Sequence, residues 1–193
     1  MSTLMKEKQM AARVRPLTPG ELTAEQSALY GAITGGLRAQ EPQHFALTAE
    51  DGALRGPFDL MLRSPAVGTA QQELGTAIRF RTALSDRVRE LAILLVAAHR
   101  DSTFERESHE AIARALGFGE PELAAVRTLD LSGFSGGERT VGQAVLELLD
   151  GDLSDASWDS ASAALGLDGL FELTALVGYY STLALQLRVF RVD

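Results

Sequence analysis

The stretch RELAILLVAAHRDSTFERESHEAIARALG, residues 89–117, decides the fold. Its first part, as far as Ala98, has almost no polar face, which predicts a helix that is buried on most sides. A short polar break at 100–102 ends this helix, and a second helix is predicted from Thr103, with Gly117 placed to act as its C-terminal cap. The stretch therefore predicts two consecutive helices, the first of which lies inside a core.

Four polar side chains of this stretch are placed to meet in one pocket. Ser102, Glu105 and His109 are spaced i, i+3 and i+7, so they share one face of the second helix. Glu90 lies at the head of the first helix, near the point where that helix enters the core. If the two helices pack as neighbours, two carboxylates, a hydroxyl and an imidazole converge.

Each of these residues also has a purely structural interpretation. Ser102 and Glu105 have the Ser-x-x-Glu form of a capping box, and Glu105 with His109 has the i, i+4 spacing of a surface pair. His109 could be a core histidine, and Glu90 could pair only with a neighbouring arginine. A metal site of these residues with His99 is a further possibility, but the spacing is a loose signal and no metal is predicted.

The rest of the chain predicts further helices, and no segment alternates between polar and apolar residues as a strand would. Residues 38–57 are rich in turn-forming residues and predict a long loop. The predicted class is all-α, a bundle of about eight helices. The helices are expected after a capping box of Thr23 and Gln26, from Pro65 to Phe80, from Ser85, from Thr103, from Pro121 to Val126, after a second capping box of Ser135 and Glu138, after Ser154, and from Asp168 onward.

Length and proline content predict how the chain is divided. A length of 193 residues fits one domain, residues 21–193. Residues 1–20 carry a charged start and two prolines, Pro16 and Pro19, which predict an extended N-terminal arm. The arm is expected to pack loosely or to clasp a partner subunit.

Composition excludes several classes of function. The formal net charge is -8 and the Lys and Arg residues are scattered, so nucleic acid is not expected as a partner. The chain contains no cysteine, which excludes disulfides, thiolate catalysis and zinc–thiolate sites. No window approaches the ~18 consecutive apolar residues of a membrane span, and residues 1–10 lack the apolar core of a signal peptide. A cytoplasmic protein without membrane contact is therefore expected.

The segment RVRELAILLVAAHRDSTFERESHEAIARALGFGEPEL, residues 87–123, resembles the core of the carboxymuconolactone decarboxylase family, an all-helical group that also contains the alkylhydroperoxidase AhpD. The resemblance covers roughly residues 57–190. Its other pieces, in the family's order, are GPFDLMLRSPAVG, ERTVGQAVLELLDG, SDASWD and ELTALVGYYSTLALQL. The resemblance implies a homo-oligomer, a trimer or hexamer, and helices that are apolar on several sides agree with burial between subunits.

The peroxidase branch of that family carries a glutamate, two cysteines three residues apart, and a histidine four residues after the second cysteine. Counted back from His109, the cysteine positions hold Glu105 and Ser102, and the glutamate is Glu90. A thiol peroxidase needs a thiolate and a resolving thiol, so this activity is excluded. The pattern that remains, an aromatic residue followed by Glu105 and His109, resembles the decarboxylase branch; the aromatic residue is Phe104.

That resemblance implies a cofactor-independent lyase acting on a small carboxylated lactone or a related enolisable acid. Loss of carbon dioxide leaves an enolate that has to be protonated at carbon, and His109 is the expected proton donor because its usual pKa of ~6.5 lies near neutrality. Glu105 or Glu90 would hold the imidazole or serve as a second acid or base.

The expected substrate-binding residues are Ser102, Tyr180 of the closing Gly-Tyr-Tyr, and Arg81. A carboxylate substrate needs a cation, and Arg81 is one of three candidates with Arg79 and Arg87. No cofactor is expected, and the partners are a small carboxylate substrate and further copies of the chain.

Two other functions stay open. An isomerase or dehydratase of a biosynthetic pathway would use the same residues for proton transfer, and residues 106–108 depart from the aromatic or small residues expected after the glutamate. A catalytically silent binding or scaffold module would keep the oligomeric fold, with Glu90 and His109 as buried structural partners.

Overall fold

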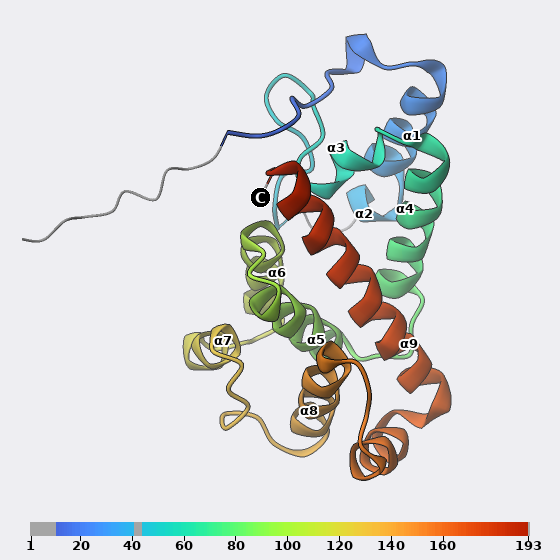
Figure 1. The fold of residues 1–193 in the computed structure, drawn as a ribbon. Helices are drawn as coiled ribbons and strands as arrows, with labels where there is room; N and C mark the ends of the chain where they lie inside the picture. The colour runs from blue at the N-terminus through green and yellow to red at the C-terminus, as the bar shows by residue number, and fades with distance from the viewer. Residues whose placement is uncertain (1–10, 41–43, 193) are drawn as a thin grey trace, which may run out of the picture.

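The computed structural model describes residues 11–40 and 44–192 of the chain, so the part of the predicted arm before Ala11 lies outside the described residues. These residues form helices and no β-strand, apart from an isolated bridge between Thr48 and Leu54. The predicted all-α class is confirmed (Figure 1). The elements are a short 3-10 helix η1 (Pro19–Glu21), α1 (Ala24–Gly35), α2 (Leu37–Gln40), α3 (Pro57–Met61), α4 (Pro65–Phe80), α5 (Asp86–His99), α6 (Thr103–Ala115), α7 (Glu120–Arg127), α8 (Gly136–Asp150) and α9 (Asp155–Phe190).

Helix α5 is the central helix of the bundle. It packs against α6, α7, α8 and α9, and α9 runs diagonally across it in Figure 1. Every residue from Glu90 to Ala97 is buried, as the absence of a polar face predicted. Burial of each large aliphatic side chain contributes about 1.5–3 kcal/mol relative to exposure. This apolar burial fixes α5, and it carries Glu90 into the core with it.

The caps that start the helices agree with the sequence in one case and differ in another. The Ser85 side chain accepts a hydrogen bond from the Val88 N–H and so caps α5. The predicted capping box of Ser135 and Glu138 is wrong, because Ser135 makes no side-chain cap hydrogen bond. Glu138 instead accepts a hydrogen bond from Arg87 Nε at 2.7 Å. An arginine on another helix has displaced the local interaction.

Two short helices stand at the ends of the predicted long loop, α2 at its start and α3 at its end. Helix α1 starts at the expected capping box of Thr23 and Gln26, but α2 follows it directly and α3 begins at Pro57. Both α2 and α3 are too short to show an apolar periodicity, which is why no pattern in the sequence indicates them. Gly56 precedes α3 with φ of 58° and ψ of -132°, a conformation that favours glycine.

Helix α9 combines the last two predicted helices. Gly166, with φ of 70° and ψ of 172°, interrupts its helical backbone between the predicted starts after Ser154 and at Asp168. By length and hydropathy, α9 is the helix among the described residues that could cross a membrane. Leu173 is fully buried in the core, whereas Phe171 is 75% exposed, so packing accounts for only part of its apolar character.

The described part of the N-terminal arm packs against the same chain. The Arg13 N–H donates a hydrogen bond to the Phe190 carbonyl at 3.0 Å. The Leu17 N–H donates to Asp59 Oδ1 at 2.8 Å. The arm thereby joins the C-terminal end of α9 to α3.

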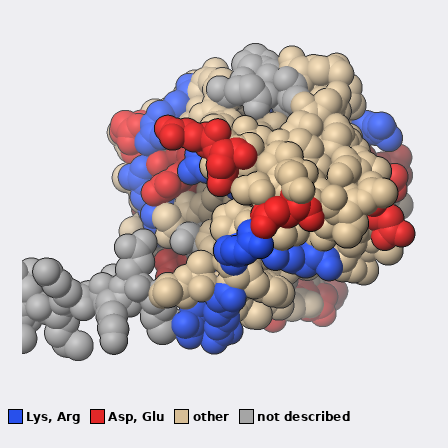
Figure 2. Space-filling model, turned by 90° about the horizontal axis from the view of Figure 1, so that it is seen from above, with Lys and Arg blue, Asp and Glu red and all other residues tan. Residues whose placement is uncertain are grey.

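The charged residues of the surface are mixed in sign. Seen from above, acidic and basic side chains lie next to one another around a broad uncharged area (Figure 2).

Candidate active site

Glu90 and His109 meet where α5 and α6 pack together. His109 Nδ1 lies 2.6 Å from Glu90 Oε2, which is a short hydrogen bond between buried groups. The aliphatic residues around Glu90 bury it on α5, and the amphipathic spacing of α6 turns His109 inward. The structure therefore brings together two residues that the sequence places 19 positions apart.

Glu105 completes a row of three ionisable groups. Glu105 Oε2 lies 3.5 Å from His109 Nε2, and its side chain is buried. The capping-box interpretation is wrong here, because Ser102 precedes α6 without a side-chain cap hydrogen bond and the Glu105 carboxylate is turned toward the imidazole. Glu105 Oε1 has no hydrogen-bond partner among the described residues, although it is buried. A buried acceptor without a partner costs about 1–3 kcal/mol, a cost that a ligand donor at this oxygen would remove.

Two arginines face the other side of the Glu90 carboxylate. Arg79 Nη1 lies 3.5 Å and Arg89 Nε 3.9 Å from Glu90 Oε1. Their side chains are 12% and 11% exposed, so solvent screens these charges only partly. The site is a row of alternating charges in which two guanidinium groups are followed by Glu90, His109 and Glu105.

The three arginines proposed for the substrate carboxylate have different surroundings. Arg79 belongs to the site through its contact with Glu90. Arg81 is exposed at the C-terminal end of α4. Arg87 lies 2.8 Å from Glu122 and 2.7 Å from Glu138, so its charge is used in a structural cluster. The structure thus brings Arg79, rather than Arg81 or Arg87, to the buried carboxylates.

The charges around His109 set its protonation state. Burial of the ring favours the neutral imidazole, but the charges and hydrogen bonds of Glu90 and Glu105 outweigh burial and raise the pKa of His109 above its usual value of 6.5. Burial likewise opposes ionisation of Glu90, yet His109, Arg79 and Arg89 together lower the pKa of Glu90 below its usual 4.5. The folded site therefore holds the His109 proton more tightly than a free histidine does, beside a Glu90 carboxylate that is held ionised. When protonated, His109 can donate a proton, and its role as the proton donor stays a prediction.

A small cavity lies on the Glu105 side of His109. Its volume is about 20 Å³, which has room for about one water molecule. Glu105, His109, Tyr180 and Phe104 all contribute to its lining. The Tyr180 ring stands edge-on to the His109 ring with centroids 5.2 Å apart, so the predicted site residue Tyr180 does reach the imidazole.

Tyr179 supports this wall of the cavity, although it was not among the site residues expected from the sequence. Its ring packs edge-on against Tyr180, with centroids 5.2 Å apart. A Cβ on Gly75 would lie 2.2 Å from the Tyr179 hydroxyl oxygen, so glycine on α4 is needed to admit this ring. The sequence signal was the Gly-Tyr-Tyr motif together with a glycine inside the helical pattern of α4.

Ser102 is the residue before α6, and His99 is the last residue of α5. Ser102 is buried at the start of α6, but it does not line the 20 Å³ cavity. His99, at the far end of α5, faces Asp150 at 3.9 Å. In the described part of the chain no group of three or more His, Cys, Asp or Glu side chains is arranged to hold a metal ion. The short contacts of His109 with Glu90 and Glu105 form an arrangement through which a proton can pass.

Comparison with known proteins identifies the fold. No protein-family model matches the chain, and no curated protein matches its sequence. An alkylhydroperoxidase AhpD core structure, that of an uncharacterized peroxidase-related protein from Ralstonia eutropha JMP134, matches with a TM-score of 0.73 at 12% identity, over 94% of this chain and 91% of that chain. The debrominase Bmp8, solved as a cysteine-to-alanine variant with 2,3,4-tribromopyrrole, matches with a TM-score of 0.71 at 12% identity, over 95% and 92%. The chain therefore has the AhpD-like helical fold.

Proposed function

We propose that the protein is a cofactor-independent acid/base catalyst, a lyase or isomerase that acts on a small enolisable carboxylic acid. The observation that carries this proposal is the position of His109, which is buried between Glu90 at 2.6 Å and Glu105 at 3.5 Å. Burying a histidine and two carboxylates together costs desolvation free energy, which stability alone does not explain. Such buried clusters of ionisable groups are typical of functional sites.

The three residues have separate roles in the proposed reaction. Glu90 accepts the Nδ1–H of His109 and keeps the ring in one orientation, and Arg79 and Arg89 hold Glu90 ionised. Nε2–H then points to Glu105, whose second carboxylate oxygen is buried without a partner among the described residues, beside the cavity. Glu105 is thus the group that passes a proton between His109 and a bound molecule.

Decarboxylation is the lyase reaction that this arrangement serves. The bond between the carboxylate carbon and its neighbour breaks, carbon dioxide leaves, and the electron pair stays behind as an extended enolate. His109, through Glu105, gives a proton to the carbanionic carbon, and solvent returns that proton to the site. An isomerase would use the same proton path, with removal at one carbon and delivery to another.

The solved structures of the same fold support small-molecule chemistry. The debrominase was solved in complex with 2,3,4-tribromopyrrole, which is a small molecule. The present chain has no cysteine, so a reaction that needs a protein thiol is excluded for it. Proton transfer by imidazole and carboxylate is the chemistry that its buried site retains.

Exchange of carbon-bound hydrogen tests the proposal even though the natural substrate is not identified. A panel of carboxylated lactones and unsaturated acids is incubated with the protein in deuterium oxide, and NMR follows deuterium incorporation and release of carbon dioxide. We expect at least one acid to react. His109→Gln and Glu105→Gln should lower its rate by about 10²–10⁴-fold, the usual contribution of a general acid or base.

The control for this experiment is Glu73→Gln, which changes an exposed glutamate on α4. It should react at the unchanged rate. Full activity in both site variants would contradict the proposal. If no acid reacts and the site variants change only the melting temperature, the catalytically silent binding module is the correct function.

A further inference from the structure

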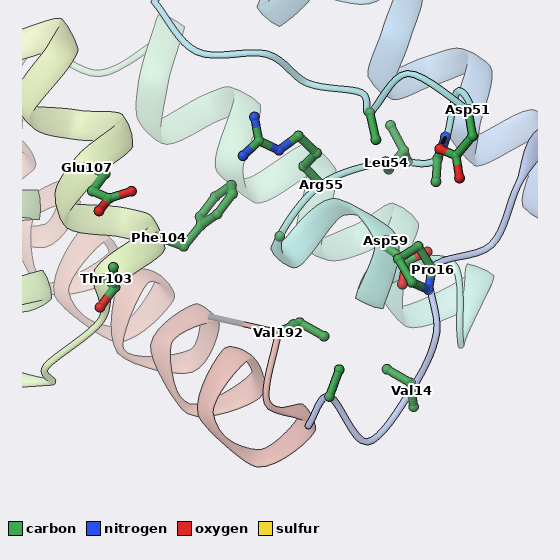
Figure 3. A pocket seen from close by; sticks show the side chains of 14 residues that line it. Val14, Pro16, Asp51, Leu54, Arg55, Asp59, Thr103, Phe104, Glu107 and Val192 are labelled. Atoms are coloured by element: carbon green, nitrogen blue, oxygen red, sulfur yellow. Dashed lines mark hydrogen bonds between the residues drawn. The ribbon is translucent and has the colours of Figure 1, made fainter. Parts of the chain in front are cut away.

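The cavity beside His109 is too small for a substrate, but a larger cavity adjoins it. The larger one, which we call the outer chamber, has a volume of about 450 Å³, within the usual range of small-molecule sites. Phe104 lines both cavities, and its ring lies between them. Figure 3 shows Phe104 at one side of the outer chamber, with Val14, Pro16 and Val192 across from it.

Segments from both ends of the chain build the apolar wall of the outer chamber. Val14 and Pro16 come from the arm, Leu54 from the loop before α3, and Val192 from the segment after α9. Hydrogen bonds of the arm to the end of α9 and to Asp59 keep this wall in place. The wall favours a ligand with an apolar body.

Among the charged groups of the outer chamber, Arg55 is the cation. Its guanidinium makes no hydrogen bond or ion pair with any side chain in the described ranges, and it extends toward the side where Phe104 lies (Figure 3). Two of the acids are already engaged: Asp59 binds Arg63 at 2.7 Å, and Asp51 accepts the Ala53 N–H at 3.0 Å. Arg55 is therefore open to an anionic ligand.

Glu107 is the remaining acid, and it is exposed on the α6 side of the outer chamber. Figure 3 places it beyond the Phe104 ring as seen from Leu54 and the arm. An anionic head group on Arg55, with its apolar body along the arm, would lie on the other side of that ring. A cationic ligand would instead have to reach Glu107.

The Phe104 ring is held in a fitted position. A Cβ on Gly56 would lie 2.4 Å from the ring, so the ring rests directly on the glycine backbone. Phe45 also contacts it edge-on, with 6.3 Å between the ring centroids. Phe104 lines both cavities, so a rotation of its side chain would join them.

We infer that the outer chamber binds an acid with an apolar body, that Arg55 binds its anionic head group, and that rotation of Phe104 admits the acid to Glu105 and His109. The inference rests on the proposed function for the last step only. Ligand binding in the outer chamber is tested independently of turnover.

Binding is tested with three probes that share one alkyl chain: octanoate, octanol and octylamine. Isothermal titration calorimetry of the full chain near neutral pH should show octanoate binding most tightly. Arg55→Gln should weaken octanoate about fivefold, the effect of one partly exposed ion pair, and leave octanol unchanged. Arg139→Gln, which removes an exposed arginine of α8, should change neither.

A second variant tests the place of binding. Ala49→Trp puts a large side chain at an exposed position on the wall of the outer chamber, and it should weaken all three probes. Unchanged octanoate binding in both Arg55→Gln and Ala49→Trp would overturn the inference. Tighter binding of octylamine than of octanoate would also overturn it, because Glu107 would then select the ligand.

The connection between the cavities is tested by NMR of the histidine rings. Octanoate should shift the ring signals of His109 and leave those of His99, which faces Asp150, in place. Phe104→Ala should enlarge the His109 shift, since it removes the ring between the cavities. If octanoate leaves His109 unchanged even in Phe104→Ala, the two cavities are not connected. A lack of turnover would contradict the proposed function but leave these binding results as they are.

Discussion

His109 Nδ1 and Glu90 Oε2 lie 2.6 Å apart in the core, and neither side chain is exposed by more than 5%. The pair joins α6 to the central helix α5, so one hydrogen bond links the packing of the bundle to the protonation of the site. Changes to this pair therefore affect stability and the pKa of His109 together.

Glu90→Gln should lower both the pKa of His109 and the stability of the fold. Loss of the carboxylate leaves the buried imidazole without its main counter-charge, and breaking one partner of a buried pair costs about 3–5 kcal/mol. Urea unfolding and NMR titration of the His109 ring measure the two effects. Glu73→Gln is the matched control, and an unchanged His109 titration in Glu90→Gln would refute the charge coupling.

Glu105→Gln should separate catalysis from stability. The Glu105 carboxylate lies 3.5 Å from His109 at a single oxygen, and its other oxygen has no partner among the described residues. Its removal should therefore cost less than about 1 kcal/mol while lowering turnover by about 10²-fold or more. Urea unfolding beside the exchange assay checks this, and a stability loss equal to that of Glu90→Gln would show a structural role.

Stability should depend on pH through His109 and Glu90 in opposite directions. The folded protein holds the His109 proton more tightly than the unfolded chain, so this contribution is complete below about pH 6.5 and is lost as pH rises through the raised folded pKa. The folded pKa of Glu90 is lowered, so its contribution is present above about pH 4.5 and is lost as pH falls through the folded value.

Together, His109 and Glu90 are expected to add most to the free energy of unfolding between about pH 4.5 and 6.5. Urea unfolding across this range measures it. In His109→Gln the alkaline decline assigned to His109 should disappear, and an unaltered decline would assign it to another group.

Gly75→Ala should disturb the tyrosine wall behind His109. The added Cβ would lie 2.2 Å from the Tyr179 hydroxyl oxygen, and overpacking of this kind costs about 1–3 kcal/mol. Gly178→Ala on α9 is the matched control, because nothing lies within 4 Å of its added Cβ. The control should be neutral or more stable by about 0.5–1 kcal/mol, as expected inside a helix. Equal effects of the two variants on melting temperature would contradict the close packing.

The outward apolar side chains of α9 predict assembly of several copies. Leu167 is 67% and Phe171 75% exposed, and α4 adds Val67 at 62%. Leu167 and Phe171 lie four residues apart on α9, and exposed apolar side chains that lie together in this way are typical of subunit interfaces. Light scattering should give a trimer or hexamer, and Leu167→Asp with Phe171→Asp should dissociate it. A monomeric unaltered chain would contradict this prediction.

The helices of the site could be predicted from the sequence because their ends carry local signals. Ser85 caps α5, and Pro65 starts α4, as expected. Helix α3 could not be predicted, since it has five residues and no repeat of apolar positions. A helix could be predicted where its apolar pattern and its capping residue indicate the same segment, as they do for α5.

The site itself was predicted in part. Spacing alone placed Glu105 and His109 on one face, but it could not decide whether Glu105 caps the helix or turns inward. Arg79 and Arg81 could not be ranked from sequence, since the end of α4 leaves Arg79 at Glu90 and Arg81 in solvent. That choice depends on how α4 ends relative to α5, which is a tertiary property.

The arm closes one side of the outer chamber, while the row of charges lies on α5 and α6. Val14 and Pro16 line the outer chamber with apolar side chains that carry no reactive group. Val192, near the other end of the described chain, also lines it with an apolar side chain. The wall of the outer chamber and the row of charges thus belong to separate parts of the polypeptide. A tag, truncation or fusion near either end would alter the wall of the outer chamber and leave Glu90, His109 and Glu105 in place.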